Sequence, residues 1–172
     1  MLLWHLGIAA LIVYVSLGRR RIDYRMILVG AVLPDVIDGI LGFFGFLEGP
    51  AGRWIAHSIL AAIAVTVVII LVFRGDRRQS LFGIGVGWML HLVADGMWAA
   101  PETFFWPAFG TEFSTSPTEP YSWDLFLDPM AHLMTWTGEL IGLAILAWFW
   151  VAFRLGQDDR FRLFLSDGYL RP

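Results

Sequence analysis

The sequence predicts an all-α polytopic membrane protein, a helical bundle of about five spans with one long extracytoplasmic loop. Hydrophobic residues make up 58% of the 172 residues and charged residues 16%, whereas soluble domains carry about 25% charged residues. The apolar residues form long runs rather than ten-residue alternating segments, which favours helices over a transmembrane β-barrel. The chain contains no cysteine, so disulfides and thiolate metal sites are excluded.

Five apolar runs are long enough, or nearly so, to cross a bilayer. They cover residues 2–17, 26–47, 54–73, 81–98 and 130–153. Arg19, Arg20 and Arg21 follow the first run. Because a signal peptide carries its positive charge before the apolar region, we expect a retained span instead. A loop over 99–129 and a cytoplasmic tail over 154–172, which we expect to lie on the membrane surface, complete a single membrane domain.

The second run is interrupted at Pro34, which predicts a kink or a broken helix because proline lacks a backbone donor and clashes with the preceding turn. Asp35 and Asp38 lie three residues apart and share a helix face, so one site could receive both carboxylates. The alternative is a polar helix end followed by a turn at Asp38-Gly39.

Four histidines lie in or at the edges of the other spans: His5, His57, His91 and His132. His91 and Asp95 are four residues apart and can face one cation. Ionisable groups inside a membrane are costly, which makes them functional candidates. The alternative for His91 and Asp95 is a hydrogen bond that fastens a helix, and for His57 a solvated or hydrogen-bonded interfacial side chain.

In the last span, His132 and Glu139 are seven residues apart and share a helix face. His132 could be a metal ligand and Glu139 a proton acceptor. Equally, the two residues could form an internal polar contact between helices. In the fourth span, Gly83, Gly85 and Gly87 lack the strand context of a dinucleotide-binding motif, so we interpret them as sites of close helix packing. No nucleotide motif is present, and we expect no nucleic-acid partner.

The segment 99–129 contains five prolines and eight aromatic residues. Loops of this length are usually functional or disordered, and the many aromatic residues argue against disorder. Two interpretations are compatible with each other: an aromatic belt at the level of the lipid headgroups, or a lid over the polar site.

A mixed set of histidines and carboxylates suits zinc, manganese or non-haem iron. The order His5, Leu33-Pro34-Asp35, Ala56-His57-Ser58 and Gly87-x3-His91-x3-Asp95, followed by Phe105-Trp106-Pro107, resembles the membrane-bound family of predicted metal-dependent hydrolases, which is distantly similar to zinc-dependent phospholipase C. The resemblance covers residues 1 to about 110. It implies that five side chains bind the metal: His5, Asp35, His57, His91 and Asp95.

The leading hypothesis is an integral membrane hydrolase that uses a divalent metal, with zinc preferred. Its substrate would be an ester or phosphoester of a membrane lipid or a lipid-linked small molecule. His132 is a further candidate ligand, and Asp38 or Glu139 is the candidate general base. Two alternatives remain open: a transporter of cations or protons, and a non-catalytic scaffold in which the metal only holds helices together.

Arginine placement predicts the topology. Of the 12 arginines, 11 follow the first, third and fifth spans, and only Arg53 lies on the other side. The positive-inside rule then places the C-terminus in the cytoplasm and the N-terminus outside. The candidate ligands would lie in the outward-facing half, beneath the loop 99–129. A cysteine at Ser116 should therefore react with an impermeant thiol reagent in intact cells, whereas one at Gln79 should not.

Overall fold

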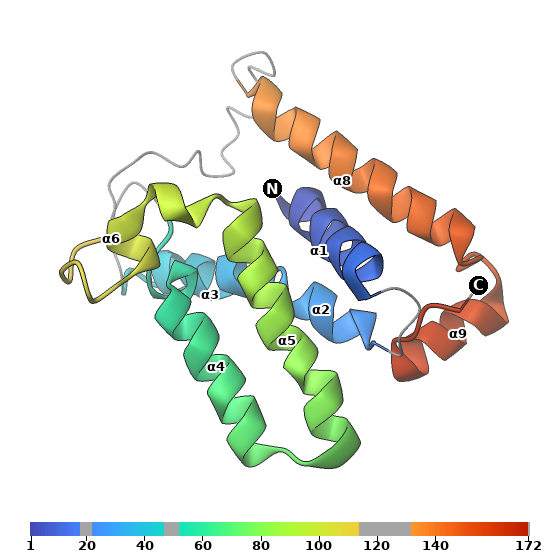
Figure 1. Ribbon diagram of the computed structural model, residues 1–172. Helices are drawn as coiled ribbons and strands as arrows, with labels where there is room; N and C mark the ends of the chain where they lie inside the picture. Colours follow the sequence, from blue (N-terminus) through green and yellow to red (C-terminus); the bar gives the residue numbers. More distant parts are fainter. Residues whose placement is uncertain (18–21, 47–51, 114–131, 172) are drawn as a thin grey trace.

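The computed structural model describes residues 1–17, 22–46, 52–113 and 132–171, and the regular structure in these ranges is entirely helical (Figure 1). The remainder of the predicted loop after residue 113, including Ser116, and residue 47 lie outside the described residues. Eight α-helices and two short 3-10 turns are described: α1 (Leu2–Leu17), α2 (Tyr24–Gly30), α3 (Leu33–Phe43), η1 (Ile55–His57), α4 (Ile59–Val72), α5 (Gly75–Ala94), η2 (Met97–Ala99), α6 (Pro101–Phe104), α8 (Leu133–Ala152) and α9 (Asp158–Asp167).

Two helical segments are long and apolar enough to cross a membrane, Tyr24–Phe43 and Leu133–Ala152. The helices α1 and α4 are apolar but shorter. The helix α5 has 20 residues, but its first turns contain Asp76, Arg77 and Arg78, which lower its hydropathy. The all-α prediction is therefore confirmed for the described residues, whereas the bundle of five spans stays a prediction.

The predicted break in the second span is confirmed, and it lies just before Pro34. The helix α2 ends at Gly30, and α3 begins at Leu33 with Pro34 in its first turn. Proline is tolerated there because the first turn of a helix has no intrahelical partner for its N–H groups. The break leaves the carbonyl oxygen of Ala31 available to a side chain from another helix.

The helix α5 begins six residues earlier than the predicted fourth span, because residues 75–80 form helix rather than loop. Asp76 lies in the first turn, where a carboxylate interacts favourably with the helix dipole. The helix ends at Asp95, and Gly96 adopts a left-handed conformation with φ of 63°. That turn terminates the helix with Asp95 at its C-cap position.

Close helix packing at glycines, predicted for the fourth span, is confirmed. Gly87 lies directly against the backbone of Ile27 and Ala31 in and after α2, and a Cβ at Gly87 would overlap that backbone. Gly85 lies against Thr66 of α4. In the same manner Gly7 and Gly142 bring α1 and α8 together, and these two helices lie side by side in Figure 1. Small residues allow the helix backbones to approach closely.

Large apolar side chains remain exposed on the outer faces of α4 and α8, including Val68, Leu71, Leu140 and Val151. Such surfaces are expected where lipid rather than water surrounds the helices. The tail returns to the protein, since Phe164 and Leu170 pack against the apolar cluster formed by α1, α2 and α8. Its predicted location on the membrane surface stays a prediction.

Candidate metal centre

Five predicted site residues from four parts of the chain converge at one end of the helices. His5 comes from the first turns of α1, Asp35 from α3, and His57 from η1, while His91 and Asp95 come from the end of α5. Their potential ligand atoms form two overlapping groups, and in each group these atoms lie within 4.8 Å of one another. The structure brings these five side chains together, whereas their role as metal ligands stays a prediction.

The ring of His57 is fully buried and held by Asp38. The Nδ1 atom of His57 lies 2.7 Å from Asp38 Oδ2. The Asp38 carboxylate also accepts hydrogen bonds from the backbone N–H groups of Trp54 and Ala56, at 2.7 and 3.1 Å. A carboxylate oxygen that already accepts from backbone N–H groups is an acceptor for the imidazole as well, so we assign the ring proton of His57 to Nδ1. Its Nε2 lone pair then faces the cluster.

The ring of His91 is oriented by the break between α2 and α3. His91 Nδ1 lies 2.8 Å from the carbonyl oxygen of Ala31. A carbonyl oxygen only accepts, so Nδ1 donates and Nε2 is left as a lone pair in the neutral ring. The two lone-pair atoms, His91 Nε2 and His57 Nε2, are 3.2 Å apart.

Two carboxylate oxygens complete a compact set with these two nitrogens. Asp35 Oδ1 lies 3.3 Å from His57 Nε2 and 3.5 Å from His91 Nε2. Asp95 Oδ2 lies 3.6 and 3.7 Å from the same two nitrogens. Ligands at the 2.0–2.2 Å bond lengths of tetrahedral zinc lie about 3.4 Å from one another. The five distances from the two nitrogens, 3.2 to 3.7 Å, are close to that separation.

His5 lies beside these four atoms and bonds Asp95. Its Nε2 atom donates to Asp95 Oδ1 at 2.8 Å, and its ring stacks on that of His91 with 4.1 Å between centroids. His5 Nδ1 is buried and has no hydrogen-bond partner among the described residues; it lies 3.9 Å from Asp35 Oδ2. With the ring proton on Nε2, His5 presents a third unprotonated nitrogen to the site, beside Asp35.

Arg53 is a member of the site that the sequence analysis did not include. Its Nη2 lies 2.8 Å from Asp95 Oδ2, and its side chain is 26% exposed. The signal that could have found it is its position, because it is the one arginine that does not follow the first, third or fifth predicted span.

Glu139 and His132 occupy other positions. Glu139 Oε2 accepts a hydrogen bond from the backbone N–H of Leu3 at 2.7 Å, which attaches α8 to the start of α1. His132 is the N-cap residue of α8 and belongs to neither group of potential ligands within the described part of the chain. Asp38 lies in the cluster, but its carboxylate is occupied by three donors.

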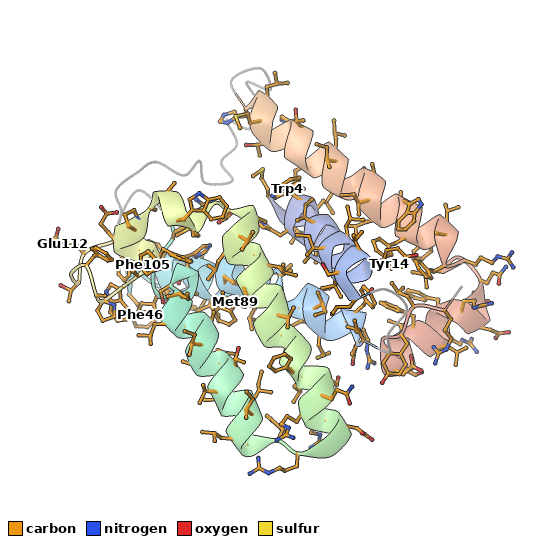
Figure 2. The ribbon with its side chains drawn as sticks, viewed as in Figure 1. Trp4, Tyr14, Phe46, Met89, Phe105 and Glu112 are labelled. Carbon is orange, nitrogen blue, oxygen red and sulfur yellow. The ribbon has the colours of Figure 1, made fainter. Side chains whose placement is uncertain are left out.

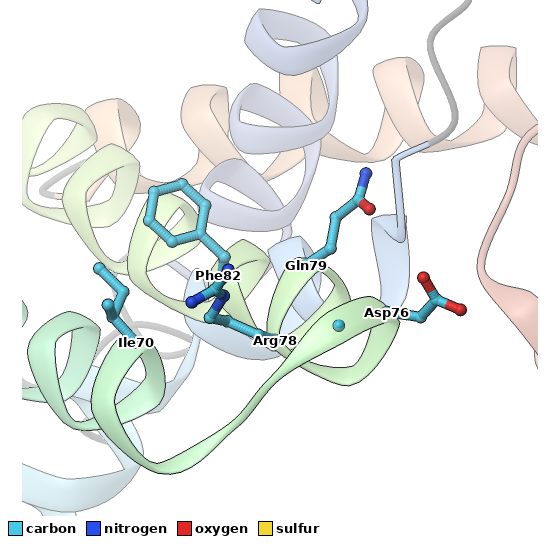
Figure 3. Close-up of a pocket in the computed structure, with 6 residues that line it drawn as sticks. Ile70, Asp76, Arg78, Gln79 and Phe82 are labelled. Carbon is cyan, nitrogen blue, oxygen red and sulfur yellow. The ribbon is translucent and has the colours of Figure 1, made fainter.

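A hollow in the described surface lies at the other end of the α4–α5 hairpin. It is lined by Ile70, Gly75, Asp76, Arg78, Gln79 and Phe82 (Figure 3). It contains none of the predicted site residues, and its one carboxylate, Asp76, belongs to neither group of potential metal ligands among the described residues. The chemistry suggested by the side chains therefore belongs to the opposite end, where α5 terminates.

The cluster could bind a divalent metal ion. It combines neutral imidazoles with carboxylates, the donor set that suits zinc and other first-row divalent metals. Asp38 and Ala31 orient the two imidazoles from behind, an arrangement common around histidine ligands. The side chain of Asp35 is 38% exposed, so one side of the set faces outward and could admit a further ligand.

The comparisons with known proteins show a membrane family. The family model described as YdjM inner membrane protein matches residues 1–160. This description specifies a membrane location and no enzymatic activity, so the resemblance to metal-dependent hydrolases and phospholipase C stays a prediction. No match was found among curated proteins or among solved structures. Since the match covers more than half of the sequence and the structure has apolar helices, the protein is a membrane protein, and the chain belongs to the YdjM inner membrane protein family.

Proposed function

We propose that this protein is an integral membrane metal-dependent hydrolase that acts on an ester or phosphoester of a lipid or lipid-linked molecule. The observation that carries the proposal is the 3.2 Å separation of His57 Nε2 and His91 Nε2, each in a ring whose Nδ1 is already a donor. Two lone pairs at this distance repel each other unless a proton or a metal cation lies between them. Zinc is the preferred ion, and manganese and iron fit the same ligands.

The charges of the site support a divalent ion. Three carboxylates, Asp35, Asp38 and Asp95, face one guanidinium, that of Arg53. With neutral imidazoles, as metal ligation requires, these groups leave two uncompensated negative charges. Unpaired charges are strongly unfavourable away from water, and one divalent cation compensates both.

The proposed roles differ among the residues. Asp35, His57, His91 and Asp95 hold the ion, and Asp38 fixes the tautomer and orientation of His57. A bound ion in an open site acidifies a water molecule and polarises an ester or phosphoryl oxygen. His5 Nδ1 is buried, has no hydrogen-bond partner among the described residues and lies 3.9 Å from Asp35 Oδ2, so it could accept a proton within the site. We therefore favour His5 over Asp38 and Glu139 as the general base.

The sequence beneath the cluster favours hydrolysis over transport. Residues 6–17, 59–73, 79–90 and 140–153 contain no Asp, Glu, His, Lys or Arg. A pathway for protons or cations across the membrane commonly uses such groups at several depths. A site confined to one end of the helices is better suited to a reaction at one face of the membrane.

We further propose that all five predicted apolar segments cross the membrane, with the N-terminus outside and the C-terminus in the cytoplasm. The positions of the arginines support this topology. The short helices α1 and α4 would then be accommodated by local thinning of the bilayer or by flanking residues at the interface.

The test is metal analysis of the detergent-purified protein, followed by a hydrolysis screen with phospholipids, lipid esters and phosphomonoesters. We expect about one zinc ion per chain and turnover that a chelator abolishes. His91→Ala and Asp95→Ala should remove both the zinc and the turnover. His132→Ala is the matched control and should retain both.

Each outcome separates one hypothesis from another. Bound zinc without turnover of any substrate, combined with a large loss of thermal stability after chelation, would support the scaffold. Flux of metal ions or protons in proteoliposomes that is lost in Asp35→Asn would support transport. A wild-type protein that retains no divalent metal would refute the proposed function.

A further inference from the structure

We infer that Arg53 binds a phosphoryl oxyanion of the substrate next to the metal centre; this inference rests on the proposed function and specifies its substrate class. Arg53 lies in the segment before η1, and its Nη2 is 2.8 Å from Asp95 Oδ2. The same oxygen lies 3.6 and 3.7 Å from the Nε2 atoms of His57 and His91, the proposed metal ligands. The guanidinium and the ion would therefore be neighbours across a single carboxylate oxygen.

The remaining donors of Arg53 are available for a ligand. The guanidinium has five N–H donors, and its one polar contact among the described residues is the 2.8 Å ion pair with Asp95. The side chain is 26% exposed. If Arg53 only neutralised the charge of Asp95, it would not need further N–H donors that a ligand can reach.

Two side chains of the site reach the surface, Asp35 and Arg53. Asp35 is the most exposed of the proposed ligands at 38%, while the side chains of His57, His91 and Asp95 are at most 1% exposed. A substrate would therefore approach past Asp35 and Arg53. A phosphoryl group has several oxygens. One of them could bind the metal ion while another accepts hydrogen bonds from the Arg53 guanidinium.

Aromatic side chains near this side are compatible with a lipid source for the phosphoryl group. Figure 2 shows Phe46 and Phe105 on the same side of the molecule, near α6 and the end of α3. Both are exposed, at 72% and 40%. The helices that precede them in the sequence, α3 and α6, contact η1, which begins two residues after Arg53. A soluble phosphoester would use the same guanidinium, so the experiment includes both sources.

The experiment measures inorganic phosphate binding to the zinc-loaded protein in nanodiscs by calorimetry. Wild-type protein should bind phosphate saturably, and sodium acetate at equal ionic strength should not compete. Arg53→Gln should weaken phosphate binding about 10- to 100-fold, the effect of losing hydrogen bonds to a charged group. Arg53→Lys should recover part of the loss, because it keeps the charge without the planar fork.

Arg74→Gln is the matched control. Its guanidinium is exposed and binds backbone carbonyls at the end of α4, away from the cluster. This variant should bind phosphate as the wild type does. Zinc content and thermal unfolding are measured for every variant, so that a folding defect or loss of the ion is recognised.

The source of the phosphoryl group is tested in nanodiscs that contain phosphatidate or phosphatidylcholine alone. Weaker phosphate binding only in phosphatidate discs indicates that a lipid headgroup occupies the site, and equal binding in both indicates a soluble phosphoester; either result supports the inference. Zinc-loaded Arg53→Gln with unchanged phosphate affinity overturns it. Competition by acetate also overturns the inference. Loss of zinc from Arg53→Gln overturns it too, because Arg53 would then act only on the metal ligands. A wild-type protein without zinc instead refutes the proposed function itself.

Discussion

Asp38 shows how a single buried carboxylate can organise the whole site. It is fully buried and accepts from two backbone N–H groups and from His57. The two backbone bonds hold the segment from Trp54 to Ala56 against α3, and the third bond selects the tautomer of His57. Asp38 therefore both holds the local backbone and orients His57, a candidate metal ligand.

At the residue scale, we predict that Asp38→Asn lowers zinc affinity about 10- to 100-fold, the usual cost of changing a residue that orients a ligand. The amide of asparagine can donate to His57 Nδ1, which would move the ring proton to Nε2 and block the lone pair. The measurement is competition with a chromogenic chelator. Asp76→Asn, an exposed change in the first turn of α5, should have no effect; unchanged zinc affinity in Asp38→Asn would contradict the assigned role.

At the scale of elements, the contact between α2 and α5 determines where His91 points. Gly87 lies against the backbone at Ile27 and Ala31, and His91 follows Gly87 by one turn. The carbonyl of Ala31 is the partner of His91 Nδ1. The same close approach of two backbones therefore packs the helices and orients the ring.

We predict that Gly87→Val lowers both the unfolding temperature and the zinc affinity, because the added side chain forces α2 away from α5 and lengthens the bond between His91 and Ala31. Gly39→Ala is the control, since a Cβ there meets no atom within 4 Å, and alanine favours helix over glycine. Thermal unfolding and zinc titration are measured in detergent. A Gly87→Val protein that binds zinc as the wild type does would contradict this coupling.

The tail is fastened to the helices by a second polar network around Asp23. The Asp23 carboxylate accepts from Ser80 Oγ at 2.5 Å and pairs with Arg25 Nη2 at 2.8 Å. Arg25 Nη1 donates to the carbonyl of Leu165, and Tyr24 N–H donates to that of Gly168. Gly168 is buried with φ of 77°, and a Cβ there would overlap the Asp23 carboxylate. The C-terminal segment therefore docks on a polar cap of α2.

This network predicts a pH dependence of stability. Burial raises the pKa of Asp23, but the hydrogen bonds from Arg25 and Ser80 and the charge of Arg25 outweigh it and hold the pKa below its usual value. The stabilisation is therefore complete above the unfolded-state pKa of about 4 and is lost as the pH falls through the lower folded-state value.

The measurement is thermal unfolding of wild type and Asp23→Asn between about pH 7 and pH 3. The difference between them should be constant at neutral pH and shrink below about pH 4. Asp158→Asn, an exposed change in the first turn of α9, should differ little from wild type throughout. A difference for Asp23→Asn that grows toward acidic pH would show the wrong sign and contradict the network.

At the scale of the whole molecule, the basic residues and the candidate metal centre occupy different ends. Figure 1 shows α9 and the turn between α4 and α5 away from the end of α5 that carries His91 and Asp95. The turn and the tail contain Arg74, Arg77, Arg78, Arg160 and Arg162. Under the positive-inside rule, the candidate metal centre would face the outside.

We predict that a single cysteine at Glu112 reacts with a membrane-impermeant thiol reagent in intact cells, whereas one at Gln79 reacts only after permeabilisation. The chain has no cysteine of its own, so no background labelling arises from it. Glu112 (Figure 2) lies in the segment after α6 and Gln79 (Figure 3) in the first turns of α5, and both are exposed. Labelling at Gln79 alone in intact cells would reverse the topology and place the chemistry in the cytoplasm.

Several features of this protein could be predicted from the sequence because their causes are local. Apolar composition determined the membrane class, and Pro34 determined a break in the second segment, since proline cannot continue the hydrogen bonding of the preceding turn. Spacings of three and four residues placed the carboxylates and His91 on helix faces. The starting point of α5 was predicted wrongly, because charged residues in a first helical turn resemble a loop in composition.

The roles within the site were decided by the tertiary structure. His5 and Asp95 are 90 residues apart, and Leu3 and Glu139 are 136 apart, so no spacing along the chain indicates which partner each side chain meets. Asp38 was expected to be a base, yet packing surrounds it with three donors; Arg53 was expected only as a topology signal, yet packing places it beside Asp95. The physical reason is that hydrogen bonds and ion pairs depend on direction and distance, and only packed helices determine these between distant segments.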